Sequence, residues 1–337
     1  SPDTLAIAEI AHGSDIAIVQ KLYARFPKFG ANEPGLADRQ YMREVDMGND
    51  RDCFSDGRVG VPLYEGRMVA AFDHRAKAYV SGRARSSLWR ELTFGAPEKA
   101  ISPQWHISAV DIPNTVGDRW RQFRLGFCDV ASPTNARTLV AALIPSGVVC
   151  GHSVPTIAFS PDDAALSLLW LAVANAMCSD YLARKKVSLH MTFSVLDSLP
   201  LPRCSEHTPI AQAIAARALT LTATGPEMEP FWRTTAPLVG LDLRSSTPCE
   251  DPAERERLQV ELDVLVARDL FQLMRDEMRY LLEPADILGP DCNFDTFGPL
   301  RRNEERDYGE FRTRRLILET WDTLPLVTQE TVPGVTR

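Results

Sequence analysis

Residues 160–184, SPDDAALSLLWLAVANAMCSDYLAR, are the stretch on which the fold depends. Its serine can cap a helix, proline suits the first turn, and Asp162 and Asp163 favour the positive end of the helix dipole. Apolar residues then recur at helical spacing. We therefore expect a core helix that begins at Ser160 and runs to about Arg184.

Basic residues close this helix as Arg184-Lys185-Lys186. Positive charge is favoured at the C-terminal end of a helix, so helix stability is the simplest explanation for the triplet. Asp180 and Arg184 are four residues apart, a spacing that predicts an ion pair worth a few tenths of a kcal/mol.

Short apolar and aromatic runs before this helix predict strands. Thr138 to Ile144 and Val154 to Phe159 are candidates, with Pro145-Ser146-Gly147 as a tight turn after the first. The segment from Trp120 to Phe127 also has strand-like composition. These runs indicate a sheet-containing core.

Helices are predicted after the helix-stopping string Leu199-Pro200-Leu201-Pro202. A small one covers Pro209 to Thr222, a stronger one starts at Asp251-Pro252, and a shorter one lies around Arg275 to Leu282. We therefore expect an α+β fold class, a mixed sheet with long packing helices and a helical C-terminal part.

Composition excludes several classes of protein. With 337 residues and 45% apolar content, the chain can bury a full core of one large or two ordinary domains. Its longest apolar stretch, Ala164 to Met177, is shorter than the roughly 20 residues that span a bilayer, so no transmembrane helix is expected. The sequence begins with Ser1-Pro2 and shows no leader in which a basic segment precedes an apolar one. This is what we expect of a piece of a longer polypeptide.

Seven scattered cysteines without a CxxC pair argue against a disulfide scaffold and against a zinc site. Their odd number fits the reducing cytoplasm. Cys150 and His152 are the closest candidate ligands, and their apolar surroundings favour core packing over a metal role.

The net charge of −8 is an objection to a nucleic-acid partner, because such domains are usually basic. The charge is unevenly distributed, however. Arg67 to Arg137 holds eleven basic and six acidic residues, a net +5, whereas Glu250 to Glu310 has a net −9. Since charges are screened beyond about 8 Å, a DNA backbone would sense the local basic face. The alternative is that these are solvated faces with no partner.

Catalytic signatures are missing from the sequence. There is no GxSxG elbow, P-loop, HExxH motif or glycine-rich turn that would hold a cofactor. His106 and His190 are not part of a nucleophile or base signature. We therefore expect no catalytic residues and no cofactor or metal site in this chain.

Longer strings carry a resemblance to a known family. Val61-Pro62-Leu63-Tyr64-Glu65-Gly66-Arg67-Met68 and Phe72-Asp73-His74-Arg75 resemble the "PLYEGKM...FDHR" segment of large bacterial adenine-N6 DNA methyltransferases. That family includes the type IIG restriction-modification enzymes and related phage-defence methylases. Arg124 to Val130, Thr134 to Thr138 and Ile144-Pro145 resemble its "R..FRDI...TNERT...IP" region.

Two further blocks follow in the same order. Asn175, Asp180-Tyr181, Arg184-Lys185 and Leu199 to Pro202 are similar to "N...DY..R.K......L..LPLP"; Glu261 to Asp263, Arg279 to Leu282 and Tyr308 to Arg315 resemble the family's C-terminal helical end. The match covers roughly residues 45 to 322. Cys128 and Ala136 depart from it, since an arginine and an acid are common there.

In that family these segments follow the catalytic domain and contain the target-recognition region. The Asn-Pro-Pro-aromatic loop that binds the flipped adenine is absent here, as is a glycine-rich loop for S-adenosylmethionine. The resemblance therefore implies a target-recognition module for double-stranded DNA. Methylation with S-adenosylmethionine would belong to an upstream methyltransferase domain, with a nuclease or other defence subunits as further partners.

DNA recognition needs backbone contacts for placement and base contacts for specificity, and arginine and asparagine suit guanine and adenine. Lys185 and Lys186 are expected to hold phosphate. Tyr64, Glu65 and Asp73 are expected either to be structural or to join the two halves of the enzyme. The predicted DNA-facing residues are Arg83, Arg85, Arg119, Arg121, Arg124, Asn135 and Arg137.

These expectations divide the chain into five parts. Residues 1–59 would connect to the upstream domain, 60–202 would be the recognition domain, and 203–249 a linker with a short helix. Residues 250–324 would be the helical C-terminal part and 325–337 a loosely held tail.

Two other functions remain open. The chain could be a protein-interaction subunit of a defence complex, with its basic face against an acidic partner. It could also be a hydrolase of unrecognised type, which a pocket joining His106 or His190 to a carboxylate would favour.

Overall fold

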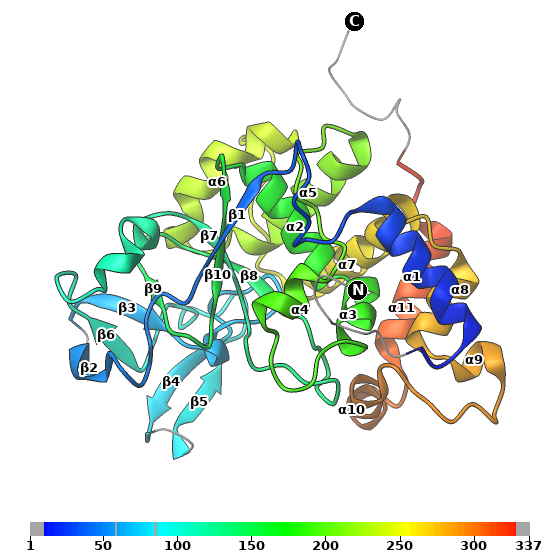
Figure 1. The fold of residues 1–337 in the computed structure, drawn as a ribbon, viewed down its shortest axis with the longest axis horizontal. Helices are drawn as coiled ribbons and strands as arrows, with labels where there is room; N and C mark the ends of the chain where they lie inside the picture. The colour runs from blue at the N-terminus through cyan, green and yellow to red at the C-terminus, as the bar shows by residue number, and fades with distance from the viewer. Residues whose placement is uncertain (1–9, 58, 84–85, 328–337) are drawn as a thin grey trace, which may run out of the picture.

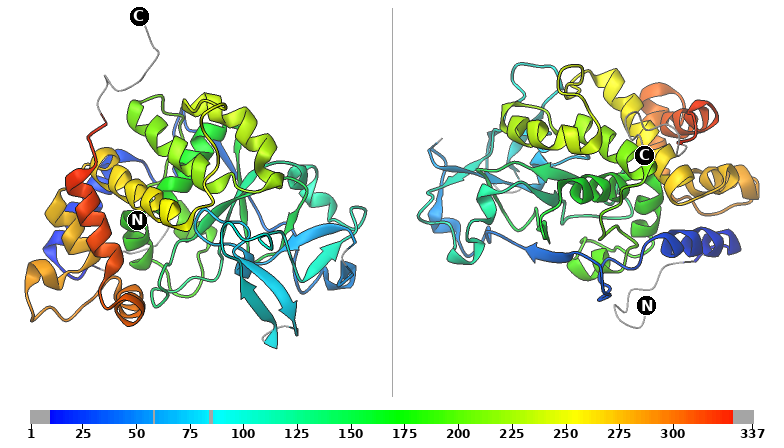
Figure 2. Two further views of the ribbon diagram at one scale, coloured as in Figure 1. Left: turned by 180° about the vertical axis from the view of Figure 1, so that it is seen from behind. Right: turned by 90° about the horizontal axis from the view of Figure 1, so that it is seen from above.

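The computed structural model describes residues 10–57, 59–83 and 86–327, which have an α+β fold with a helical C-terminal part (Figure 1). The strands gather at one end of the molecule and the C-terminal helices at the other, as the views in Figure 2 also show. The expected fold class is thus confirmed.

The central sheet has four antiparallel strands in the order β1-β10-β7-β8. Its first strand, β1 (Asp38–Met42), pairs along its whole length with β10 (Thr156–Ser160). In the middle β7 (Arg124–Phe127) pairs with β8 (Ala141–Ile144), and both are buried at every position. Strands therefore form within or next to the three predicted runs, with shorter bounds.

A smaller sheet and a hairpin form the outer part of the strand-rich end. The sheet has the order β2-β6-β3-β9, with β2 (Phe54–Ser55), β6 (Trp105–Ile107), β3 (Val61–Tyr64) and β9 (Val149–Cys150). The hairpin consists of β4 (Lys77–Ser81) and β5 (Leu88–Glu91), and it projects from the body in Figure 1.

Helices cover the central sheet and make up the C-terminal part. Three helices, α5, α7 and α8, match the sequence prediction closely. Local caps define the start of two of them, since Thr208 caps α5 and Asp251 caps α7. The helices are α1 (Gly13–Arg25), α2 (Ala164–Asn175), α3 (Met177–Arg184), α4 (Phe193–Asp197), α5 (Pro209–Thr222), α6 (Glu229–Thr235), α7 (Pro252–Val264), α8 (Arg275–Leu282), α9 (Ala285–Leu288), α10 (Gly298–Tyr308) and α11 (Arg312–Thr323).

The single helix predicted from Ser160 to Arg184 is wrong in two respects. Ser160 ends strand β10, and the helix cap is Asp163, whose side chain accepts a hydrogen bond from Leu166 N. The chain then bends by 62° between α2 and α3 at Ala176. Within the described part of the chain no single helix has the length and apolarity to cross a membrane, although this bent pair together reaches both.

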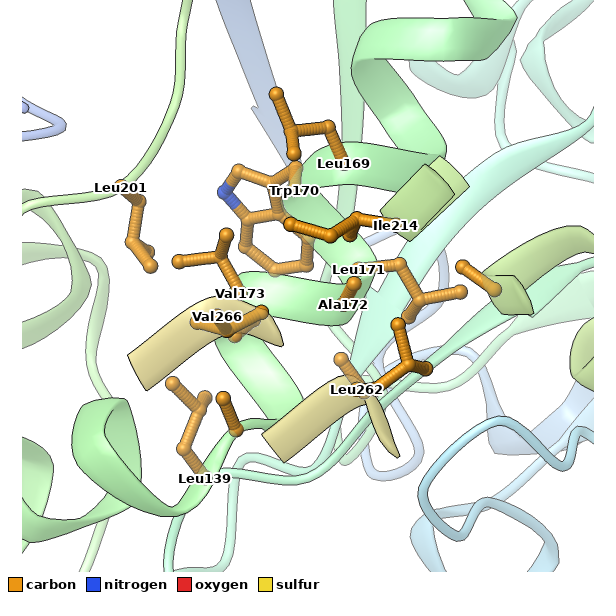
Figure 3. Close-up of a cluster of buried hydrophobic side chains, with 14 of the residues drawn as sticks. Leu139, Leu169, Trp170, Leu171, Ala172, Val173, Leu201, Ile214, Leu262 and Val266 are labelled. Carbon is orange, nitrogen blue, oxygen red and sulfur yellow. The ribbon is translucent and has the colours of Figure 1, made fainter. Parts of the chain in front are cut away.

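The main hydrophobic core surrounds α2, from which Trp170, Leu171 and Val173 are fully buried. Figure 3 shows Ile214 of α5 and Leu262 of α7 reaching the same cluster. Each fully buried apolar side chain of this size stabilises the fold by about 1.5–3 kcal/mol relative to exposure. Strand and helix layers therefore share one core.

This shared core corrects two of the expected boundaries. Residues 13–42 are no connector, because Ile18 and Leu22 of α1 lie in the main core and β1 forms one edge of the central sheet. Within the predicted segment 203–249 the short helix forms as expected at Pro209–Thr222, but it packs along α2 and so belongs to the shared core. The predicted tail falls mostly on residues 328–337, which lie outside the described residues.

Candidate nucleic-acid interface

Arg119 and Arg124 were expected to face DNA, and this expectation is wrong. Both lie in the interior, with side chains 8% and 0% exposed. The carboxylate of the fully buried Glu44 accepts hydrogen bonds from Nε and Nη2 of Arg124 at 2.5 and 2.7 Å. Arg119 donates to Thr156 and to the carbonyl of Gln40. Arg119 thus binds β1 and β10, and Arg124 binds Glu44, which follows β1. Neither side chain is accessible to a ligand.

The side chains of Arg137 and Lys185 also bind groups of the protein itself. Arg137 donates to the carbonyl of Asn175 and lies 3.6 Å from Asp180. Lys185, whose side chain is 12% exposed, forms a 3.2 Å ion pair with the buried Asp15 of α1. A charge already matched in this way attracts phosphate weakly, so neither residue fits the predicted DNA contact.

Lys186 was expected to hold phosphate and is half-buried instead. Its ammonium group donates to the hydroxyl of Ser198 at 3.1 Å and lies 5.6 Å from the centre of the Tyr23 ring. Burial, together with the nearby charge of Lys28, lowers the pKa of Lys186 to about 8. Lys186 therefore points into the protein near α4.

Of the predicted DNA-facing residues, Arg83, Arg121 and Asn135 are exposed. The Arg121 side chain is 62% exposed and pairs with the equally open Asp118. Arg85 lies outside the described residues. The eight predicted residues that the structure describes thus do not form one continuous surface.

The hairpin β4–β5 concentrates exposed basic side chains. Arg83 lies between its strands with 70% of its side chain exposed, and Arg90 is exposed on β5. Lys77 lies opposite Glu91 across the ladder. In the sequence, residues 76–91 carry four basic residues and one acid, a net charge of +3.

Arg90 and Lys77 were counted among the basic residues of the sequence but not selected as site residues. A signal for them existed: two short runs, 77–81 and 88–91, flank a turn that begins with Gly82. A hairpin prediction there would have placed Arg83 and Arg90 on one projecting element.

The "FDHR" string is buried and structural. Asp73 binds the Lys99 ammonium at 2.7 Å, and Tyr64 hydrogen-bonds His74 at 2.9 Å. Arg75 lies 3.1 Å from Glu227, just before α6. Burial lowers the pKa values of both Lys99 and His74. This network joins the strand-rich end to the helices, which explains why these residue types occur together.

Glu65 directly follows strand β3 and is partly buried, and this burial raises the pKa of its carboxyl group. Together with the burial of Tyr64 and Asp73 this favours a structural role for all three over contact with a ligand.

In the described part of the chain, His106 and His190 do not line either of two cavities large enough for a small molecule. His190 does contact a carboxylate, Asp129, at 2.9 Å, but the other oxygen of Asp129 binds Arg43 at 2.8 Å. Cavities of about 530 and 480 Å³ are lined by residues 27–33 and by α5 with Leu324–Val327, without His106 or His190. In the described ranges no group of three His, Cys, Asp or Glu side chains could hold a metal ion.

Comparison with known proteins adds no family assignment: no family model matches the chain, and no curated protein matches its sequence. The resemblance to adenine-N6 DNA methyltransferases therefore depends on the four motif blocks alone. Of their residues, Arg124, Asn175, Asp180 and Arg184 are buried and hold the strands and helices together.

Proposed function

We propose that the chain is the sequence-specific DNA-recognition module of an adenine-N6 DNA methyltransferase of restriction-modification or phage defence. Four motif blocks in the order of that family support the proposal, and the sequence contains no Asn-Pro-Pro-aromatic loop of its own. Transfer of the methyl group from S-adenosylmethionine would then be the task of a separate catalytic domain, in the bacterial cytoplasm where the target DNA lies.

The observation that carries the proposal is the projecting hairpin β4–β5 with its net charge of +3. Positive side chains that neutralise phosphates release condensed counterions, and this supplies most of the non-specific affinity of DNA-binding proteins. Arg83 and Arg90 are exposed on this element, whereas the acidic residues of the C-terminal part are largely paired with arginines there. A duplex can therefore approach the hairpin in spite of the overall negative charge.

The experiment is a titration of a fluorescent duplex with the full chain at several salt concentrations. We expect weak binding whose affinity falls linearly with salt on logarithmic axes. Arg83→Glu combined with Arg90→Glu should lower the affinity about tenfold or more, since each reversal replaces an attraction by a repulsion.

The matched control is Arg233→Glu on α6. The Arg233 side chain is 71% exposed and has one carboxylate partner, Glu229, much as Arg83 is 70% exposed near Asp56. This variant should bind duplex like the wild type. Absence of duplex binding by the wild type, or equal losses in the hairpin variant and the control, would contradict the proposal.

A further inference from the structure

The outer face of the hairpin carries aliphatic as well as basic side chains. Leu88 and Arg90 are two residues apart on β5 and therefore share one face of the strand. Val80 is the unpaired residue of the β-bulge on β4, next to Leu88. Val80 and Leu88 are 56% and 61% exposed. Two exposed aliphatic side chains next to arginines on a projecting element form a mixed surface that suits a partner with both charge and apolar groups.

The other face of the hairpin is fixed to the protein. Trp89 packs against the cluster around Tyr64 and Met68, and it meets Tyr79 edge-on with ring centres 5.7 Å apart. The Trp89 indole nitrogen donates to Ser87, which also accepts hydrogen bonds from Arg67. Leu88 and Arg90 are thus exposed on the face opposite Trp89, where Ala78, the partner of Arg90, is buried.

The start of the turn between the strands is anchored at Gly82. Gly82 has φ +87°, and a Cβ there would lie 2.5 Å from the carbonyl oxygen of Ser86, so a side chain is excluded. The Gly82 carbonyl accepts hydrogen bonds from the Tyr79 hydroxyl at 2.6 Å and from the Gln104 amide at 3.3 Å. Arg83 thus directly follows a residue whose carbonyl is bound by two side chains of the protein.

The dimensions of a two-stranded ribbon select one groove of DNA. The major groove is about 12 Å wide and admits such a ribbon, whereas the minor groove, about 6 Å wide, does not. Beyond the anchored Tyr79–Trp89 pair, residues 80–82 extend at most roughly 10 Å at about 3.3 Å per residue, which matches the roughly 8.5 Å depth of the major groove. The hairpin can therefore reach base edges.

Building on the proposed function, we propose that hairpin β4–β5 enters the major groove of duplex DNA and reads bases there. Arg83 and Arg90 donate hydrogen bonds to N7 and O6 of guanine. Val80 and Leu88 contact the 5-methyl group of thymine. Each contact type matches a group that only the major groove exposes.

The experiment alters single groups in the DNA. Repeated selection from a random-sequence duplex pool with the full chain yields the preferred sequence, which is then resynthesised with base analogues. Deoxyuridine removes the thymine methyl group and 7-deazaguanine removes N7, both in the major groove, whereas inosine removes the guanine amino group of the minor groove. We expect deoxyuridine and 7-deazaguanine each to weaken binding about fivefold or more, with inosine having little effect.

Variants assign the contacts to the hairpin. Val80→Ser with Leu88→Ser should remove the sensitivity to deoxyuridine, and Arg83→Ala with Arg90→Ala the sensitivity to 7-deazaguanine. Leu238→Ser is the matched control, because Leu238 is 67% exposed on the short helical segment Ala236–Val239, and it should leave both sensitivities unchanged.

The outcomes separate the two proposals. Salt-dependent duplex binding that is insensitive to deoxyuridine and 7-deazaguanine, or selection that enriches no sequence, overturns major-groove reading and leaves a DNA-binding function in place. Sensitivity to inosine alone overturns it in favour of the minor groove. If the wild type binds no duplex at all, the proposed function itself fails.

Discussion

The structure gives Arg124 a different role from the one that the sequence indicates. In the sequence it belongs to a basic stretch, but in the structure its guanidinium is enclosed with Glu44, which lies 80 positions earlier in the chain. Removal of one partner from a buried pair leaves an uncompensated charge, which is far more costly than loss of an exposed pair.

We therefore expect Glu44→Gln to lower the free energy of unfolding by about 3–5 kcal/mol, measured by urea denaturation. The control is Asp118→Asn, which breaks the exposed pair with Arg121 and should cost less than about 1 kcal/mol. Similar losses in the two variants would show that the Glu44–Arg124 pair contributes no more than a surface pair.

Asp263 of α7 provides a pH-dependent test. Burial raises the pKa of this carboxyl to about 6, although the charge of Arg137 and a hydrogen bond from Met177 N act in the opposite direction. A raised pKa means that the folded protein favours the protonated acid. Wild-type stability should therefore fall, relative to a neutral variant, as the pH rises from about 4 to about 6.

Asp263→Asn keeps an oxygen acceptor for Met177 N and removes the titration. Between pH 4 and pH 7.5 its stability relative to the wild type should rise by about 2–3 kcal/mol, since one pKa unit corresponds to about 1.4 kcal/mol. Chemical denaturation at both pH values measures the difference. A pH-independent difference would mean that Asp263 titrates normally.

At the scale of elements, the end of α2 is decided by Asn175. Its side-chain amide accepts a hydrogen bond from Ala141 N at 3.0 Å and donates one to Ala141 O at 2.9 Å, so it pairs with β8 as another strand would. The following helix starts again at Met177, whose N–H donates to Asp263. The bend at Ala176 thus has partners on both sides that come from distant parts of the sequence.

Asn175→Ala should leave the amide and the carbonyl of Ala141 unsatisfied in the interior. Each such group costs about 1–3 kcal/mol, so a loss of roughly 2–6 kcal/mol is expected in thermal or chemical unfolding. Asn135→Ala, at an exposed position, should change stability by less than about 0.5 kcal/mol. An Asn175 variant as stable as the Asn135 variant would show that water replaces the side chain.

At the scale of the whole molecule, Arg255 joins the strand-rich end to the helices. From α7 it donates to the carbonyl oxygens of Leu221, Cys249 and Phe72, and its guanidinium stacks 3.4 Å from the centre of the Phe94 ring. With the ion pairs of Asp73 and Arg75 it forms a buried junction that couples the two ends, so its loss should allow the strand-rich end to open by itself.

Arg255→Met keeps much of the side-chain volume and removes these hydrogen bonds. In native-state hydrogen exchange we expect the amides of β3 and β6 to lose about tenfold or more of their protection, while those of α2 change much less. Arg233→Met, at an exposed site, should leave exchange unchanged. A uniform loss of protection over the whole chain would indicate that Arg255 stabilises one cooperative unit and does not act as a junction.

The sequence by itself determined the helices α5, α7 and α8 and the positions of three of the four central strands, β7, β8 and β10, because caps, helical spacing and turn residues act over a few neighbours. It also determined the uneven charge of the chain. Only the tertiary structure decided which charges remain exposed. Arg124 and Lys185 are buried in ion pairs with Glu44 and Asp15, whereas Arg83 is exposed on a hairpin. The reason is that burial and ion pairing depend on partners far away in the chain, and no local sequence pattern specifies those partners.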